Sequence, residues 1–311
     1  MQPEHLTNLI EKVTSPSDGR KANPRVSEVV GRIVKDLFHT IEDLDVTPEE
    51  FWSAMDYLRD VGTNNEFGLL APGLGFEHLL DLRMDEAEHA AGLDGATPRT
   101  IEGPLFVPGA PKSKGEARLD DGSDEEGDFV FMSGRILSTD GTPIEGAVVD
   151  VWHANTRGLY SIFDSDQTPY NLRRKIETGS DGRYAFRSIL PSGYACPPNG
   201  PTQQLLDQLG RHGNRPAHIH IMVEAPDHRT LTTQINLDGD EYLHDDFAFA
   251  TREELVAVTV LHDDPADIEA RGLTAPFYTI DFDFTLNTSS EAVDFDRVDR
   301  ARVEAQMVAV A

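Results

Sequence analysis

The hydrophobic pattern of this chain changes near residue 97, and this change limits the folds open to it. Before that point apolar residues recur with helical spacing, and after it they fall in short runs bounded by glycine, proline and aspartate. The pattern predicts a mainly β protein with an α-helical N-terminal segment. With 311 residues, 39% of them hydrophobic, the chain can build one large or two modest domains.

Three helices are expected before residue 97. Val29 to Leu44 carries one apolar stripe, which predicts a helix facing a core. Thr47-Pro48-Glu49-Glu50 supplies an N-cap, a proline at the first helical position and a capping-box glutamate, so a second helix should follow it. Glycine and proline then break the chain at 72–75, and a third helix is expected over Phe76 to Ala91.

The part after residue 97 predicts a β-sandwich. The strand runs are Phe129–Ile136, Ala147–His153, Arg183–Ile189, Ala217–Val223 and Thr279–Leu286. In the last run apolar and polar residues alternate, as in a strand with one buried face. The acidic loop at 120–126 lacks the spacing of a calcium loop and is interpreted as a solvated turn. In the tail beyond Asn287 the sequence predicts a helix from Val298 to Val310. The expected domains are 1–97, 98–286 and 287–311.

Charge and cysteine content narrow the possible partners. A formal charge of -28 repels nucleic-acid phosphates and anionic lipid surfaces, so no nucleic-acid partner and no membrane insertion are expected. A small neutral substrate suits this field better. The single cysteine, Cys196, excludes an internal disulfide, and the first residues lack the pattern of a secretory signal, so a cytoplasmic location is expected.

The segment Arg215-Pro216-Ala217-His218-Ile219-His220-Ile221-Met222-Val223 is the most informative stretch. On a strand, His218, His220 and Met222 share one face because side chains alternate. By themselves two such histidines are as typical of a hydrogen-bonded pair as of a metal site. Glu224 allows a second interpretation, a cupin metal motif, but the spacing to a following glycine and a third histidine motif are missing.

Two tyrosines stand in loops upstream of these histidines. Tyr160 follows Gly158 shortly after the run that ends at His153, and Tyr194 lies in the glycine- and proline-rich turn 190–198. A single tyrosine of this kind is usually a packed ring with a satisfied hydroxyl. Two of them together with His-x-His favour a metal site.

Taken together, these motifs resemble the intradiol dioxygenase family, and the likeness covers essentially the whole chain. The matching segments are Gly68–Phe76, Thr97–Leu105, Gly134–Ile136, Gly146–Trp152, Gly158–Tyr160, Leu190–Tyr194 and Arg215–His220. The resemblance implies a β-sandwich catalytic domain and a helical linker domain that joins a homodimer, with an amphipathic tunnel that has room for a phospholipid. It also implies one ferric ion, Fe(3+), per subunit.

The resemblance also implies the roles of individual residues. Tyr160 and His218 would be equatorial iron ligands and Tyr194 and His220 axial ones, with hydroxide in the fifth position. Catechol would displace the hydroxide and Tyr194, which accept its two protons, and reaction with O2 would give cis,cis-muconate. Arg215 and Gln234 would stand beside the substrate. The implied pocket wall is Leu69, Pro72, Ile101, Pro104, Leu105, Cys196, Phe247 and Ala248.

The chemistry of the residues suits ferric iron. Two phenolates are hard anionic donors, whereas zinc usually takes thiolate, imidazole or carboxylate. Keeping a tyrosine ionised at pH 7 against a pKa near 10 takes about 4 kcal/mol, which a bound trivalent cation can supply. Arg215 has a second interpretation as a structural ion pair, and Cys196 is interpreted as a wall residue because no histidine is placed to activate it.

Other functions compatible with the sequence remain. Within the resembling family these are cleavage of hydroxyquinol or chlorocatechol, although a close-fitting apolar wall with Leu69 and Pro72 favours plain or methyl-substituted catechol. From another class, a non-catalytic transthyretin-like binding module would share the strand Gly146 to Val151. Such a module would not need both tyrosines and both histidines.

Overall fold

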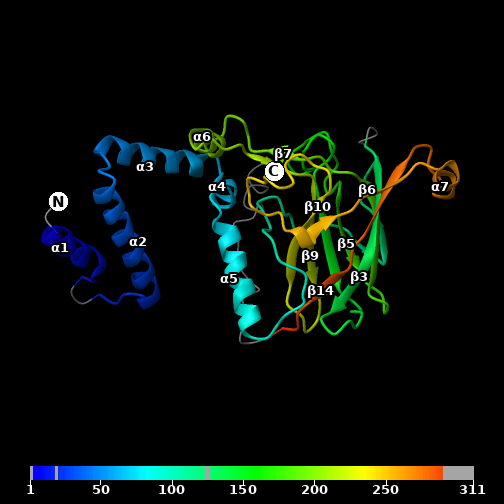
Figure 1. Cartoon of the computed structure of the whole chain (residues 1–311), viewed down its shortest axis with the longest axis horizontal. Coiled ribbons are helices and arrows are strands. Elements are labelled where there is room, and N and C mark those ends of the chain that lie inside the picture. Colours follow the sequence, from blue (N-terminus) through cyan, green and yellow to red (C-terminus); the bar gives the residue numbers. More distant parts are fainter. Residues whose placement is uncertain (1–2, 18–19, 123–126, 290–311) are drawn as a thin grey trace. The chain divides into compact units, whose positions relative to one another are not determined.

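The computed structural model describes residues 3–17, 20–122 and 127–289 (Figure 1). The chain divides into two compact units, Met1–Thr63 and Asn64–Ala311. The first unit contains helices α1 (Pro3–Thr14), α2 (Pro24–Asp43) and α3 (Pro48–Thr63). The expected helix from Val298 to Val310 lies outside the described residues.

The predicted start of α3 is confirmed in detail. The backbone N–H of Thr47 donates to the Glu50 carboxylate at 2.8 Å, and the Glu50 N–H donates to the Thr47 hydroxyl at 3.2 Å. This reciprocal capping box satisfies two backbone donors that a helix end leaves free. At α2 the Asn23 side chain accepts from two backbone N–H groups in the same way.

The prediction that α2 faces a core is wrong for the single chain. None of its residues is buried, and Ile33 and Leu37 are 52% and 56% exposed. The helical periodicity is correct, but much of the apolar surface of α2 stays exposed in the single chain. We call the residues Val29, Val30, Ile33 and Leu37, all exposed, the α2 apolar stripe.

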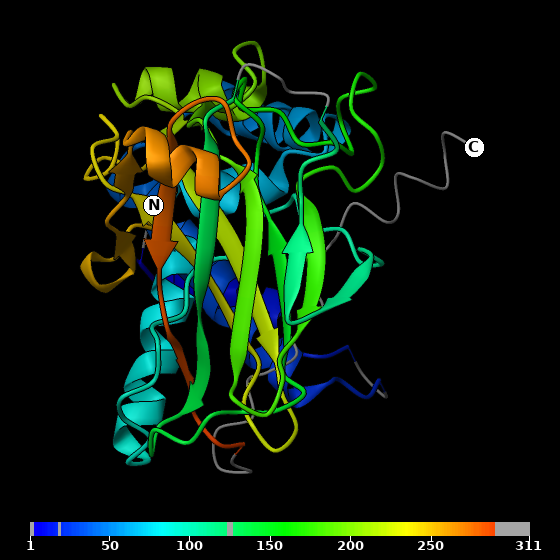
Figure 2. The same ribbon diagram turned by 90° about the vertical axis from the view of Figure 1, so that its right-hand side faces the viewer.

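The second unit is a β-sandwich, which confirms the predicted fold class (Figure 2). One sheet has the order β1 (Lys112–Lys114), β5 (Arg173–Glu177), β4 (Val148–Trp152), β9 (His218–Glu224), β10 (Leu231–Leu237) and β11 (Val256–Ala257). The other has the order β12 (Val260–His262), β13 (Phe277–Asp281), β3 (Phe129–Ser138), β6 (Arg183–Ile189) and β2 (Glu116–Arg118), with β14 (Phe284–Leu286) also paired to β3. The antiparallel pair of β7 (Tyr194–Ala195) and β8 (Asn214–Arg215) forms a third, small sheet.

The core of the sandwich is made by side chains from both large sheets. Val149, Ile219 and Ile235 come from the first sheet, Val130 and Phe186 from the second, and all are fully or almost fully buried in one cluster. Because alternate residues of β9 point to opposite faces, its isoleucines are fixed in this core and its histidines must face away from it.

One expected strand is broken in two. The run Thr279–Leu286 was expected to be continuous, but β13 ends at Asp281 and β14 begins at Phe284. At the break, the Tyr184 hydroxyl donates to the Phe282 carbonyl, and Asp283 accepts from the Arg135 backbone N–H. These hydrogen bonds join residues that are far apart in the sequence, so the apolar alternation does not reveal them.

Four α-helices complete the described part of the second unit: α4 (Phe67–Gly73), α5 (Phe76–Ala90), α6 (Pro201–Gln208) and α7 (Pro265–Ala270). Glu88 of α5 is buried and bonded to Arg99, Arg229 and Asn287, so this helix is tied to the sandwich. The compact units therefore divide at residue 63, two helices before the expected division at 97. No helix in the described ranges is both long and apolar enough to cross a membrane.

Candidate active site

Strand β9 places the two histidines side by side. His220 is paired in register with Trp152 of β4 and Gln234 of β10, and His218 is paired with Asn236. Both imidazoles are buried, and their Nε2 atoms are 3.1 Å apart. The face opposite the core therefore carries the pair, as the alternation predicts.

Both imidazoles are held in the neutral form. Nδ1 of His218 donates to the Pro216 carbonyl at 2.6 Å, which leaves the lone pair on Nε2. Burial and then the charge of Arg215 lower the pKa of His218 to about 3. Burial also holds the pKa of His220 well below its ordinary value. A neutral imidazole with an available lone pair is the form that binds metal ions.

Two glycines allow the tyrosine loops to approach each other. Gly158 has φ +74°, and a Cβ there would lie 2.8 Å from the Tyr194 Cβ. A Cβ on Gly193 would lie 2.5 Å from the Arg215 carbonyl oxygen. Only glycine fits these positions. As a result the rings of Tyr160 and Tyr194 meet edge to face, with centroids 5.6 Å apart.

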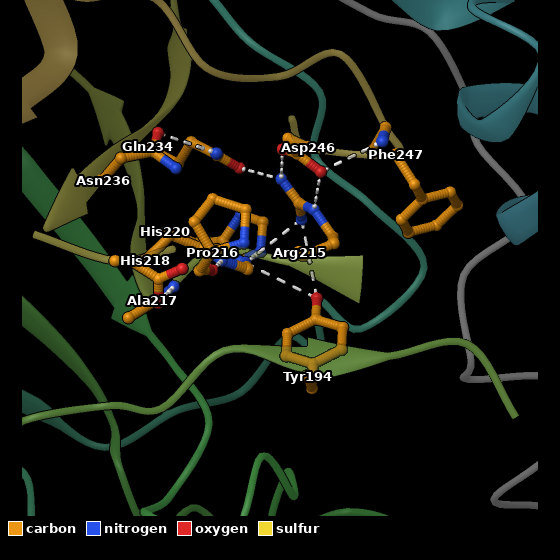
Figure 3. A network of polar contacts seen from close by, with 12 residues as sticks. Tyr194, Arg215, Pro216, Ala217, His218, His220, Gln234, Asn236, Asp246 and Phe247 are labelled. Carbon is orange, nitrogen blue, oxygen red and sulfur yellow. Dashed lines mark hydrogen bonds and ion pairs between the residues drawn. The ribbon is translucent and has the colours of Figure 1, made fainter. Parts of the chain in front are cut away.

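Arg215 links Tyr194 and His218 to a buried polar network (Figure 3). Its guanidinium forms two 3.1 Å contacts with Asp246 and donates to Gln234 Oε1 at 2.7 Å. It also lies 3.1 Å from His218 Nε2 and 3.5 Å from the Tyr194 hydroxyl. Burial disfavours its charge, but Asp246 together with Tyr194 and Tyr160 outweighs this effect, and the pKa of Arg215 is raised. Arg215 therefore stays a fixed cation at the site. It also forms an ion pair, with Asp246, as its second interpretation expects.

A cavity of about 440 Å³ opens beside this cluster. The eight expected wall residues, Leu69, Pro72, Ile101, Pro104, Leu105, Cys196, Phe247 and Ala248, all line it, and so do Tyr160, Tyr194 and Arg215. Gln234 lies behind Arg215 and is fully buried. Burial raises the pKa of the Cys196 thiol to about 12, so the thiol stays protonated and inert.

The sequence did not point to several residues that shape the site. Asp246 holds Arg215, and Trp152 stacks on the His220 ring with centroids 4.8 Å apart. Arg173 lies over the ring of Tyr160. These residues have no motif of their own. The sequence indicated two of them only by position. Trp152 lies in the segment Gly146–Trp152 that resembles the family, and Asp246 directly precedes the expected wall residue Phe247.

The residues present fit a ferric ion. The Tyr160 hydroxyl and His220 Nδ1 are buried without a hydrogen-bond partner among the described residues. Burial raises the pKa of Tyr160 well above its ordinary value, so ionising it takes a strong cation nearby. Two phenolates and two neutral imidazoles suit hard trivalent iron. In the described part of the chain no three His, Cys, Asp or Glu side chains are grouped so that they could hold a metal ion.

The fold and this site define a class of enzyme. The family model described as "Dioxygenase" matches residues 101–288, and the one described as "Catechol dioxygenase N terminus" matches residues 23–92. The chain belongs to the catechol dioxygenase family, whose members are intradiol dioxygenases that use non-haem iron.

Individual relatives are similar in sequence to this chain along nearly its whole length. The catechol 1,2-dioxygenase of Acinetobacter baylyi is 53% identical over 94% of both chains, and catechol 1,2-dioxygenase 2 of Acinetobacter lwoffii is 60% identical over 82% of this chain and 92% of its own. The crystal structure of the Acinetobacter radioresistens catechol 1,2-dioxygenase superposes with a TM-score of 0.92 at 50% identity, covering 97% of this chain and 98% of that one. Relatives named for hydroxyquinol and chlorocatechol are more distant, at 35% and 38% identity.

Proposed function

We propose that this enzyme cleaves catechol with O2 between the two hydroxyl-bearing carbons and releases cis,cis-muconate. The observation that carries the proposal is the meeting of buried Tyr160, partly buried Tyr194 and two neutral buried histidines beside one apolar cavity, which both tyrosines line. The high identity to catechol 1,2-dioxygenases over most of the chain supports catechol as the substrate.

The ligand set we propose is Tyr160, Tyr194, His218 and His220, holding one Fe(3+) per subunit. When bound, the ferric ion supplies a Lewis acid that ionises the ligand phenols and draws electron density from a coordinated catechol. Its site needs both tyrosines, because the histidines alone provide no negative charge to offset three positive charges.

The side chains that line the cavity have different roles in the proposed reaction. Tyr194 is partly buried and lines the cavity, while Tyr160 is buried, so Tyr194 is the tyrosine whose oxygen would accept a substrate proton. Arg215, held by Asp246 and Gln234, offers a fixed positive charge where negative charge develops on the opening ring. The apolar wall from Leu69 to Ala248 excludes water and holds the aromatic ring.

The test is to load the protein with ferric ion and compare Tyr160→Phe and His220→Ala with the unchanged chain. Both variants should lose most of the iron, the visible phenolate-to-iron band and turnover together. Tyr184→Phe removes another fully buried hydroxyl away from the cavity and should keep all three. Full activity in a bleached Tyr160→Phe protein would disprove the ligand assignment, and a yellow muconic semialdehyde as the main product would disprove the cleavage position.

Substrate choice within the family has a direct test. The rival substrates, hydroxyquinol and chlorocatechols, differ from catechol by an added hydroxyl or chlorine that the wall must accommodate. The wall contributed by Leu69, Pro72 and Ile101 is apolar, so it offers an extra hydroxyl no hydrogen bond. Steady-state kcat/KM should rank catechol above hydroxyquinol, and the reverse ranking would overturn this part of the proposal.

The domain roles are part of the same proposal. We assign residues 1–97 to a helical linker and dimerisation domain, 98–286 to the catalytic domain and 287–311 to a tail. The limits of the two matching family models, 23–92 and 101–288, support a functional division near residue 97. A homodimer would cover the α2 apolar stripe. An apolar cavity of about 240 Å³ between α1 and α2, lined by Val13, Val26, Val30 and Val34, supports a phospholipid acyl chain there.

We also place the enzyme in the cytoplasm. Cys196, the only cysteine in the sequence, is a free, buried thiol, so the fold uses no disulfide and suits a reducing compartment.

A further inference from the structure

A buried cation stands behind the proposed ligand Tyr160 and has no role in the function so far described. Arg173 opens strand β5 and is 2% exposed. Its guanidinium carbon lies 5.6 Å from the centroid of the Tyr160 ring. It does not line the cavity, so it cannot touch the substrate.

The bonding of Arg173 is unusual for a buried arginine. Both terminal nitrogens, Nη1 and Nη2, are buried and have no hydrogen-bond partner among the described residues. Asp150 acts on it electrostatically, but the ion pair of Asp150 is with Lys175 at 3.1 Å. A buried guanidinium without such partners is costly, so a structural role would normally supply them.

Arg215 is a second buried cation near Tyr160. Arg215 also acts on Tyr160, but its charge is offset by Asp246. The charge of Arg173 is therefore the less compensated of the two that act on Tyr160. Burial lowers the pKa of Arg173 to about 10, which still leaves it protonated at neutral pH. A cation over an aromatic face is attracted by the ring, and the attraction increases when the ring carries the negative charge of a phenolate.

We propose that Arg173 is a positioning residue that stabilises the phenolate of Tyr160 from behind the ring and so sets how strongly this ligand donates to the metal. The inference rests on the proposed function, because it takes Tyr160 as a ligand of ferric ion. A nearby positive charge lowers the energy of the phenolate electrons, which raises the energy of the phenolate-to-iron transition.

The experiment compares the visible spectrum of the iron-loaded protein with those of Arg173→Met, Arg173→Gln and Arg173→Lys. The two neutral variants should move the band to longer wavelength, while Arg173→Lys keeps the charge and should restore a band near the original position. The neutral variants should also lower kcat several-fold with little change in KM for catechol. Arg174→Gln is the matched control, since this arginine is adjacent on β5 and points to the other face of the strand, and it should leave the band unmoved.

Each outcome decides between the two claims. If the unchanged protein shows no phenolate band, the proposed ligand set fails. If it shows the band and the neutral variants leave it unmoved, only the role of Arg173 is wrong. If neither neutral variant folds, by circular dichroism, while Arg173→Lys does, the charge serves the fold and the proposal is likewise overturned.

Discussion

At the scale of single residues, the site depends on the buried ion pair of Arg215, which lines the cavity, with Asp246. We predict that Asp246→Ala leaves the Arg215 guanidinium without its partner, lowers the free energy of unfolding by about 3–5 kcal/mol and reduces turnover. The double variant Arg215→Met, Asp246→Leu replaces the pair by apolar groups and should regain most of the stability. Urea unfolding and catechol turnover measure the two effects. If the double variant regained turnover as well, Arg215 would have no role beyond stability.

A second prediction at the residue scale concerns the pH dependence of stability, and it rests on His153. Its Nδ1 donates to the Ala154 carbonyl and its Nε2 accepts from Ser188, both at 2.7 Å, so the buried ring is neutral. Burial lowers its pKa from 6.5 to about 4. The unfolded chain therefore binds a proton as pH falls through about 6.5, and the folded chain does not until about 4.

Because the unfolded state gains that proton first, the contribution of His153 is complete above pH 6.5 and is lost as pH falls toward 4. The loss should be about 3 kcal/mol. We predict that His153→Gln unfolds with a flatter pH dependence between pH 7.5 and 4.5 in urea titrations. Replacing the exposed His39 by glutamine controls for removing an imidazole. Parallel pH profiles for the original and His153→Gln proteins would contradict the prediction.

At the scale of elements, the closeness of the two tyrosine loops is set by Gly158. We predict that Gly158→Ala forces these loops apart, because the added Cβ meets the Tyr194 Cβ at 2.8 Å and the residue has φ +74°. Iron content and the visible band should fall sharply. Gly146→Ala is the control: it has nearly the same φ, +73°, but nothing lies within 4 Å of the added atom. It should cost about 1 kcal/mol of stability and keep the iron. Equal iron loss in both variants would show that backbone strain, and not the contact, matters.

The elements also show what a sequence can and cannot predict. The helix from Pro48 and the strand around His218 were predictable because capping and alternation are local. Strand β10 was missed, since Thr233, Gln234 and Asn236 are polar residues that are nevertheless buried. The partners of Arg215 and Tyr160 were missed for the same reason. Asp246 and Arg173 reach the site through the packing of distant segments, and no local pattern encodes such contacts.

At the scale of the whole molecule, the α2 apolar stripe is the surface on which the proposed homodimer can be tested. We predict that the protein is a dimer by light scattering and that Ile33→Asp with Leu37→Asp splits or destabilises it. The proposed iron ligands all lie after residue 150, so iron binding should be disturbed last. His39→Asp adds a charge to the same helix, off the stripe, and should leave the dimer intact. A monomer at micromolar concentrations in the unchanged protein would refute the prediction.

The cavity wall is built from several separate segments of the chain, and this affects how the enzyme can evolve. The wall residues come from separate stretches around Leu69, Ile101, Cys196 and Phe247, whereas His218 and His220 are fixed by strand β9. A substitution in one stretch alters the shape offered to the ring without moving the histidine pair. Selection can therefore explore new aromatic substrates one segment at a time while the chemistry itself is inherited unchanged.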